Sequence, residues 1–146
     1  MIRFLSFLLF LLCCHSPMGM AQGKKDMKDY WIDKYLSVSF PLESIRINST
    51  FGSRVDPFTG KHKQHKGLDL RARYEEVLSM FDGYVKGVGY DSGSGKYITM
   101  QYGDYTVSYC HLSEIWVSDN QKVCAGDPIG ISGTTGRSTG PHLHIT

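Results

Sequence analysis

Two histidines near the end of the chain, His142 and His144, are separated by a single residue. In an extended strand such residues project from the same face, with Cα atoms roughly 6.5–7 Å apart. Leu143 between them points the other way, toward a core. Two imidazoles on one face can share a metal ion and a water molecule. The preceding Gly140-Pro141 pair predicts a turn that leads into this strand.

A second cluster, His65 and Asp69, offers another imidazole and a carboxylate. Because four is an even spacing, both side chains would lie on one face of a single strand. Histidine nitrogens and a carboxylate oxygen are the ligand set of a mononuclear Zn²⁺ site with an open coordination position. Affinity order alone does not select zinc over copper, but these ligand types favour zinc. The two clusters together predict a zinc centre built from distant parts of the chain.

His111 lies at the end of a predicted strand, where a structural role and a role in proton transfer are both open. Hydrolysis at a metal needs a group that accepts a proton and a group that stabilises the charged tetrahedral intermediate. Neutral imidazoles suit both tasks near pH 7. If three of these side chains bind the metal, His111 and one histidine of the terminal pair remain available for these tasks. His62, which lies in a short basic run, is expected to be solvated.

The first 21 residues predict a secretory signal peptide, with a positive charge at Arg3, an apolar run over residues 4–14 and small residues before a cleavage site after Ala21. The apolar run is shorter than the ~20 residues that span a bilayer. An uncleaved signal anchor is one alternative, and a lipoprotein signal is another, disfavoured by the bulky residues before Cys14. We expect a secreted protein, periplasmic or extracellular, without membrane contact after cleavage.

The chain left after cleavage has 125 residues (146 minus 21), enough for one domain with a core. Removing Arg3 leaves 15 basic against 14 acidic residues, a net charge of +1. Such a balance gives no reason to expect a nucleic acid partner, and the sequence does not predict an oligomeric state.

Two cysteines, Cys110 and Cys124, remain after cleavage of the signal peptide. An exported chain with an even number of cysteines suggests a disulfide, and two reduced cysteines on neighbouring strands are the alternative.

Residues 22–37 form a polar leader, and residues 38–146 read as one domain of short strands separated by Gly- and Asp-containing turns. No helical period holds past residue 40, so we predict an all-β fold, a compact, mostly antiparallel, sandwich-like domain with little helix. The expected strands include 65–72, 77–80, 83–88, 97–102, 105–112, 121–123 and 128–131, and the last one carries the histidine pair. Residues 113–117 are expected to form an irregular or helical turn.

Six segments match a known family in the family's own order, over roughly residues 38–146. They are FGSR at 51–54, HKGLD at 65–69, DG at 82–83, YCHLS at 109–113, GDPIG at 126–130 and GTTGRSTGPHLH at 133–144. Because of these six segments, the chain resembles the LytM/lysostaphin-type zinc metallopeptidases, which cut peptide bonds in bacterial cell walls. The ordered set is far more specific than its H-x-x-x-D or H-x-H pattern alone.

The resemblance implies a role for each candidate residue. His65, Asp69 and His144 match the family's zinc ligands, and His111 and His142 match its catalytic histidines. It implies that a metal-activated water attacks a peptide bond of peptidoglycan, with His142 as general base and His111 orienting the water and stabilising the oxyanion. Sequence does not decide how the two histidines share these tasks, nor whether glycine bridges or D-alanyl cross-links are cut.

The chain departs from the family at two places. Residues 73–76 replace a small Gly-Thr-Pro-like turn, which could reshape one wall of the groove, and the chain stops at Thr146, where the family usually continues, so we expect a truncated domain. A non-catalytic relative that binds the wall or a wall hydrolase is the main alternative function, but such relatives lose ligands that are present here. A carrier domain would need a modifiable lysine in a tight turn, which the sequence lacks.

Overall fold

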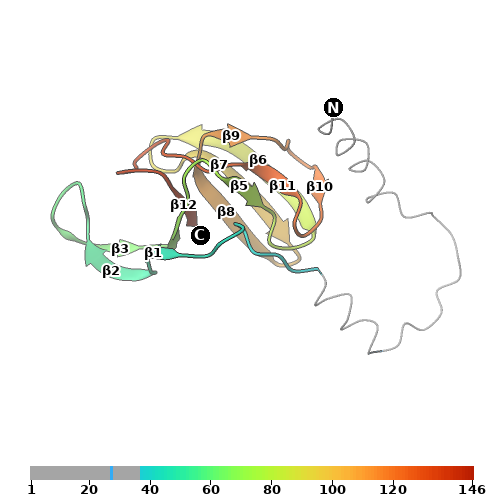
Figure 1. Ribbon diagram of the computed structural model, residues 1–146, viewed down its shortest axis with the longest axis horizontal. Coiled ribbons are helices and arrows are strands. Elements are labelled where there is room, and N and C mark those ends of the chain that lie inside the picture. The colour runs from blue at the N-terminus through green and yellow to red at the C-terminus, as the bar shows by residue number, and fades with distance from the viewer. Residues whose placement is uncertain (1–26, 28–36) are drawn as a thin grey trace, which may run out of the picture. The chain divides into compact units, whose positions relative to one another are not determined.

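The computed structural model describes Met27 and residues 37–146, and residues 38–146 form one compact unit of strands and turns (Figure 1). The predicted signal peptide, and the predicted leader apart from Met27 and Ser37, lie outside the described residues. Within the described part of the chain, no helix has the length and apolar character needed to cross a bilayer.

The compact unit is built from strands that pair only in the antiparallel sense. The strands are β1 (Ile47–Ser49), β2 (Gly52–Val55), β3 (His62–His65), β4 (Leu68–Arg71), β5 (Glu76–Leu78), β6 (Gly83–Asp91), β7 (Gly95–Tyr102), β8 (Tyr105–Leu112), β9 (Glu114–Ile115), β10 (Lys122–Val123), β11 (Pro128–Ile131) and β12 (His142–Ile145). Over residues 38–146 they form a seven-stranded sheet in the order β1-β4-β12-β8-β7-β6-β10, a three-stranded sheet β5-β11-β9 and the β2–β3 hairpin. Figure 1 shows this hairpin projecting from the body of the unit.

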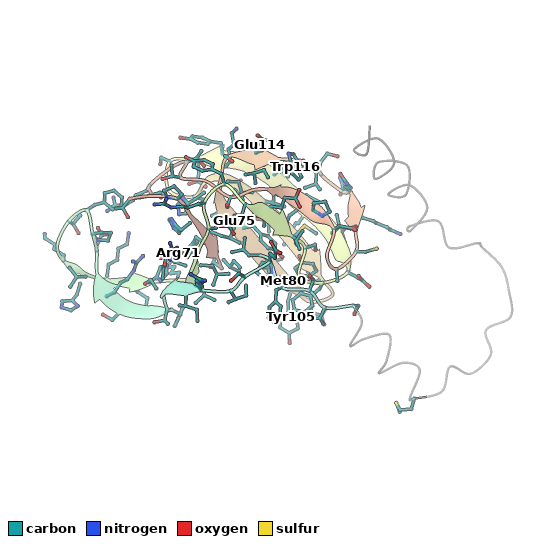
Figure 2. The ribbon with its side chains drawn as sticks, viewed as in Figure 1. Arg71, Glu75, Met80, Tyr105, Glu114 and Trp116 are labelled. Atoms are coloured by element: carbon teal, nitrogen blue, oxygen red, sulfur yellow. The ribbon has the colours of Figure 1, made fainter. Side chains whose placement is uncertain are left out.

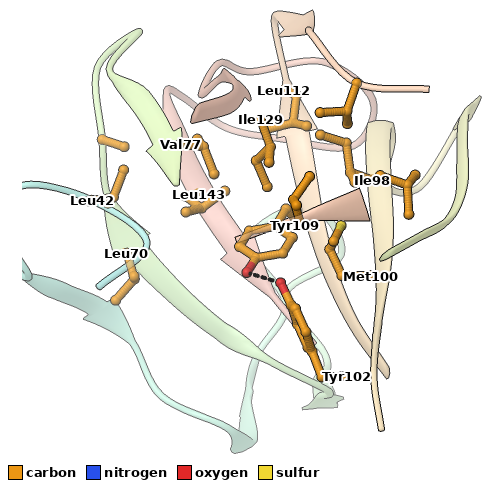
Figure 3. Close-up of a cluster of buried hydrophobic side chains, with 14 residues drawn as sticks. Leu42, Leu70, Val77, Ile98, Met100, Tyr102, Tyr109, Leu112, Ile129 and Leu143 are labelled. Atoms are coloured by element: carbon orange, nitrogen blue, oxygen red, sulfur yellow. Dashed lines mark hydrogen bonds between the residues drawn. The ribbon is translucent and has the colours of Figure 1, made fainter. Parts of the chain in front are cut away.

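The core lies between the seven-stranded and the three-stranded sheets (Figure 3). Val77 and Ile129 come from the smaller sheet, and Leu70, Ile98 and Leu143 come from the larger one; all five are fully buried. Since side chains alternate along a strand, burying Leu143 in this core turns the neighbouring residues of β12 to the opposite face. The core therefore orients the strand that carries the histidine pair.

A chain of buried hydroxyl groups crosses one end of the core. The Tyr109 hydroxyl accepts a hydrogen bond from the Met80 amide (3.0 Å) and lies 2.9 Å from the Tyr102 hydroxyl, as the dashed line in Figure 3 marks. The Tyr102 hydroxyl lies 3.0 Å from Ser79 Oγ, which donates to the Phe81 carbonyl. Burial raises the pKa of Tyr109, so this hydroxyl keeps its proton. Each hydroxyl group can donate a hydrogen bond to the next, from Tyr109 through Tyr102 and Ser79 to the Phe81 carbonyl, so every buried hydroxyl has a partner.

The structure confirms the all-β antiparallel fold, and the strands expected over 97–102 and 105–112 are present as the paired strands β7 and β8, but two expected elements are wrong. The single strand expected over 65–72 is two strands, β3 and β4, because the chain leaves the β2–β3 hairpin at Lys66-Gly67 to enter the large sheet. The turn expected over 113–117 contains β9, which pairs with β11 and so forms the edge of the small sheet.

Cys110 and Cys124 are not joined by a disulfide. Cys110 is buried in β8, and burial raises the pKa of its thiol to about 11. A thiol in this state is a small apolar side chain rather than a nucleophile. For Cys110 this agrees with the reduced alternative, but the two cysteines do not lie on neighbouring strands, because β7 and β6 separate β8 from β10, the strand that Cys124 follows.

Tyr109→Phe should destabilise the domain by about 1–3 kcal/mol, because the Met80 amide and the buried Tyr102 hydroxyl lose a hydrogen-bond partner while the shape of the core is kept. Unfolding in denaturant measures this change. Tyr105→Phe is the matched control, since Tyr105 lies in the same strand but is 78% exposed; it should change the stability by less than about 0.5 kcal/mol. Equal stability of the two variants would contradict the role given to the hydroxyl chain.

Candidate metal centre

Three predicted ligands meet at one end of the large sheet. Nε2 of His65 lies 3.1 Å from Oδ1 of Asp69 and 3.1 Å from Nδ1 of His144, and this Nδ1 lies 2.7 Å from the same oxygen. The three side chains offer ligand atoms within 4.8 Å of one another, a spacing that could hold a metal ion. His65 and Asp69 are buried, and His144 is partly exposed.

The hydrogen bonds of these three side chains make them suitable ligands for a cation. Nδ1 of His65 donates to the Thr50 carbonyl at 2.8 Å, because a carbonyl can only accept. In a neutral ring the other nitrogen, Nε2, then carries a lone pair and faces the Asp69 carboxylate, which is also an acceptor. Two acceptors at 3.1 Å attract only when a proton or a metal ion lies between them. Two imidazole nitrogens and one carboxylate oxygen suit Zn²⁺ in particular.

Arg54 holds the second oxygen of Asp69. Its Nη2 donates to Oδ2 at 3.2 Å, which leaves Oδ1 facing His65 and His144. Burial of Asp69 alone would favour its neutral form, but the hydrogen bond from His144 and, when they are protonated, the charges of the surrounding histidines lower the pKa of this carboxyl. An ionised carboxylate is the form that binds a metal ion. Residue types alone do not single out Arg54 as a site residue, although it lies in the FGSR segment that matches the family.

Strand register brings Asp69 and His144 together. In the β4–β12 pair His144 lies directly opposite Asp69, and Leu143 lies opposite Leu70 on the core face. Opposite residues of an antiparallel pair share a face, so ligands from positions far apart in the chain become neighbours. Gly67 allows the close packing: a Cβ there would lie 2.3 Å from the Ile145 carbonyl oxygen and 2.7 Å from the His144 ring.

An irregularity in β8 turns His111 toward the same site. Tyr109 and Leu112 are both fully buried in the core although they are three residues apart, and the pairing of β7 with β8 shifts register between Lys96 and Ile98. His111 has a φ of 62°, which is uncommon for a residue other than glycine. A β-bulge of this kind adds a residue and re-aims a side chain. Strict alternation would have placed His111 on the core face with Tyr109.

Backbone carbonyls orient the two histidines proposed for catalysis. Nδ1 of His111 donates to the Thr135 carbonyl, and Nδ1 of His142 donates to the Gly140 carbonyl, both at 2.8 Å. Each neutral ring therefore keeps a lone pair on Nε2. The His111 and His142 ring centroids are 4.6 Å apart, and Nε2 of His142 lies 3.6 Å from Oδ1 of Asp69. Burial lowers the pKa of His111, which favours the neutral, proton-accepting form.

These histidines line an open groove of about 900 Å³. The β2–β3 hairpin forms one wall and the loop of residues 133–140 forms another. Arg137 joins the two walls: it donates to Asp56 at 3.0 Å and lies 4.4 Å from the Phe58 ring centroid. The Phe58 amide, together with Thr59 and Arg137, lowers the pKa of Asp56, so this carboxylate is ionised at neutral pH. His62 is exposed and lines no part of the groove, as expected.

Gly67→Ala should weaken binding of a divalent cation by about tenfold or more, because the added methyl group displaces His144. Titration of the metal-free protein with Zn²⁺ measures this effect. Gly87→Ala is the matched control, since a Cβ at Gly87 meets nothing within 4 Å. Unchanged affinity in a folded Gly67→Ala variant would contradict the role given to Gly67 in positioning His144.

Arg54→Gln should weaken the same binding by about 10–100-fold, the usual effect of losing a residue that orients a ligand. The Asp69 carboxylate would lose its fixed orientation and part of its charge stabilisation. Competition with a chelator of known affinity gives the difference, and Arg46→Gln, outside the groove, is the control. Equal metal affinity of the two variants would argue against this role of Arg54.

Comparisons with known proteins agree with this geometry. The model of Peptidase family M23 matches residues 63–146. A peptidoglycan DD-endopeptidase of Vibrio cholerae serotype O1 is 40% identical over 109 residues, which are 72% of this chain and 25% of that protein. The chain spans only 23% to 30% of the length of the first curated relatives.

Solved structures with a similar fold include peptidases. A zinc-containing peptidase from Vibrio cholerae has a TM-score of 0.67 and 35% identity, covering 73% of this chain and 34% of that one. The catalytic domain of lysostaphin from Staphylococcus simulans has a TM-score of 0.64 and 30% identity, covering 69% of this chain and 77% of that one. By its family match, its sequence relatives and its fold, the chain belongs to Peptidase family M23.

Proposed function

We propose that residues 38–146 form a zinc-dependent endopeptidase domain that hydrolyses peptide bonds in bacterial peptidoglycan. The observation that carries the proposal is the meeting of His65, Asp69 and His144 beside His111 and His142 in one groove. Membership of a peptidase family supports the reaction class, and relatives named peptidoglycan DD-endopeptidases support the substrate.

In this proposal the metal ion would be held by Nε2 of His65, Oδ1 of Asp69 and Nδ1 of His144. When bound, zinc supplies Lewis acidity and makes water a nucleophile near neutral pH. Three protein ligands would leave a coordination position open, as in catalytic rather than structural zinc sites. The Thr50 carbonyl and Arg54 then act as the groups that orient two of the ligands.

Two histidines handle the proton. Nε2 of His142 accepts a proton from the attacking water, since its Nδ1 is already committed as a donor to Gly140. Nε2 of His111 accepts a hydrogen bond from the second O–H group of the same water and takes this proton as the C–O bond forms, so that it becomes a donor to the oxyanion. His142 then gives its proton to the leaving nitrogen as the C–N bond breaks. The close approach of the two rings supports this shared task. A non-catalytic binding module would have no need for two such lone pairs beside the ligand group.

We also propose an exported protein, because peptidoglycan lies outside the cytoplasmic membrane. Residues 1–21 would be its signal peptide and residues 22–37 a polar leader before the peptidase domain. The periplasm and the cell exterior or cell wall are both compatible with this location.

Purified full-length protein should release new peptide ends from peptidoglycan, detected by mass spectrometry of muropeptides, and a chelator should abolish the release. His65→Ala and Asp69→Ala should lose both metal and hydrolysis. His111→Ala should keep the metal and slow turnover by about 10²–10⁴-fold, the usual contribution of acid–base catalysis.

His62→Ala is the control, because His62 is exposed and outside the groove; it should act at the native rate. Peptide release that persists without metal would exclude a zinc mechanism. A metal-loaded protein without any peptide release would favour the binding-module alternative. Full activity of His111→Ala would remove that histidine from the mechanism.

A further inference from the structure

The groove is lined by more basic than acidic side chains. Its basic lining residues are Arg54, Lys63, Lys66, Arg71, Arg73 and Arg137, and its acidic ones are Asp56 and Asp69. Both carboxylates already have cationic partners: Asp69 is paired with Arg54, and Asp56 with Arg137 and, at 3.9 Å, with Lys63. The remaining cations leave a local positive field, although the whole chain is nearly neutral.

Arg71 stands directly beside the proposed general base. In the β4–β12 pair Arg71 lies opposite His142, so the two side chains share one face, and Arg71 follows Asp69 by two residues on that same face. Figure 2 shows Arg71 at the end of the unit that carries the β2–β3 hairpin. Arg71 is exposed, and its guanidinium forms no ion pair or hydrogen bond with any described residue.

Arg73 extends the same basic surface through a fixed turn. Tyr74 has a φ of 55°, in the left-handed region. The backbone of Glu75 is hydrogen-bonded in both directions to Ser132, through the Ser132 hydroxyl and the Ser132 amide, each at 2.9 Å. The Glu75 carboxylate accepts from the Arg73 amide rather than pairing with a guanidinium. The turn thus holds Arg73 at the groove without neutralising it.

We propose that Arg71, supported by Arg73, binds a free carboxylate of the substrate next to the scissile bond. The inference rests on the proposed function and narrows its substrate class. Opposite Cα atoms in an antiparallel pair are about 4.5–5.5 Å apart, and an extended peptide rises roughly 3.3–3.4 Å per residue. A carboxylate one residue from a bond held near His142 is therefore within reach of the long Arg71 side chain. A guanidinium binds a carboxylate through two parallel hydrogen bonds.

This subsite discriminates between two kinds of cell-wall peptide. Cross-linked stem peptides carry free carboxylates close to their D-alanyl cross-links, whereas glycine bridges carry none. A carboxylate would be paired in this groove, but a neutral glycine peptide would leave Arg71 and Arg73 without partners. The groove therefore favours anionic stem peptides over glycine bridges.

Two synthetic peptides test the subsite. One contains a D-alanyl peptide bond followed by a residue with a free carboxylate, and the other has a carboxamide in place of that carboxylate. Their binding is measured by calorimetry with the zinc-loaded, full-length His111→Ala variant, in which turnover is slow. The carboxylate peptide should bind at least about tenfold more tightly. Adding Arg71→Gln should remove this preference, and adding Arg71→Lys should retain part of it because the charge stays.

Arg46→Gln in the same background is the matched control, because Arg46 is exposed but lies outside the groove; it should leave the preference unchanged. Equal binding of the two peptides, or a preference that survives in the Arg71→Gln, Arg73→Gln double variant, would overturn the subsite. Hydrolysis by the native chain is measured separately and reports on the proposed function. Active protein without a carboxylate preference would thus refute only the subsite, and carboxylate-selective binding without hydrolysis would refute only the enzyme.

Discussion

The site depends on where the protons of its imidazoles are held. His65, His111 and His142 each donate from Nδ1 to a backbone carbonyl at 2.8 Å. A carbonyl oxygen cannot donate, so each neutral ring must present an unprotonated Nε2. One of these lone pairs faces the Asp69 carboxylate, where only a cation makes the contact favourable. The path of the backbone thereby determines which nitrogens can bind metal or accept a proton.

One loop supplies two of these carbonyls. The Thr135 and Gly140 carbonyls both belong to the loop of residues 133–140, and the Thr135 hydroxyl fastens that loop to β8 by donating to the Leu112 carbonyl at 2.7 Å. The loop also packs tightly on the start of β7: a Cβ at Gly136 would lie 2.2 Å from the Gly95 nitrogen. The small residues of this segment are therefore needed for close contact, and the contact sets the orientation of both proton-handling histidines.

Residue types and strand alternation were enough to predict the fold class and to select the candidate side chains. The histidine pair of β12 follows simple alternation, because Leu143 is buried in the core. His65 and Asp69 do converge, but from two strands rather than from one, since the chain changes sheets at Lys66-Gly67. The bulge that turns His111 outward, and the carbonyls that orient the rings, depend on tertiary pairing. No pattern of residue types along the chain encodes them.

The positions of the polar side chains on one face of the β4–β12 pair depend on the apolar packing of the opposite face. Because side chains alternate, a slip of one residue would move Leu143 into the groove and both histidines into the core. Leu143 and Leu70 are fully buried opposite each other, and burial of each contributes roughly 1.5–3 kcal/mol. The same register that buries this pair sets His144 against Asp69 on the other face. Apolar packing, rather than attraction among the polar groups, therefore fixes the spacing of the candidate ligands.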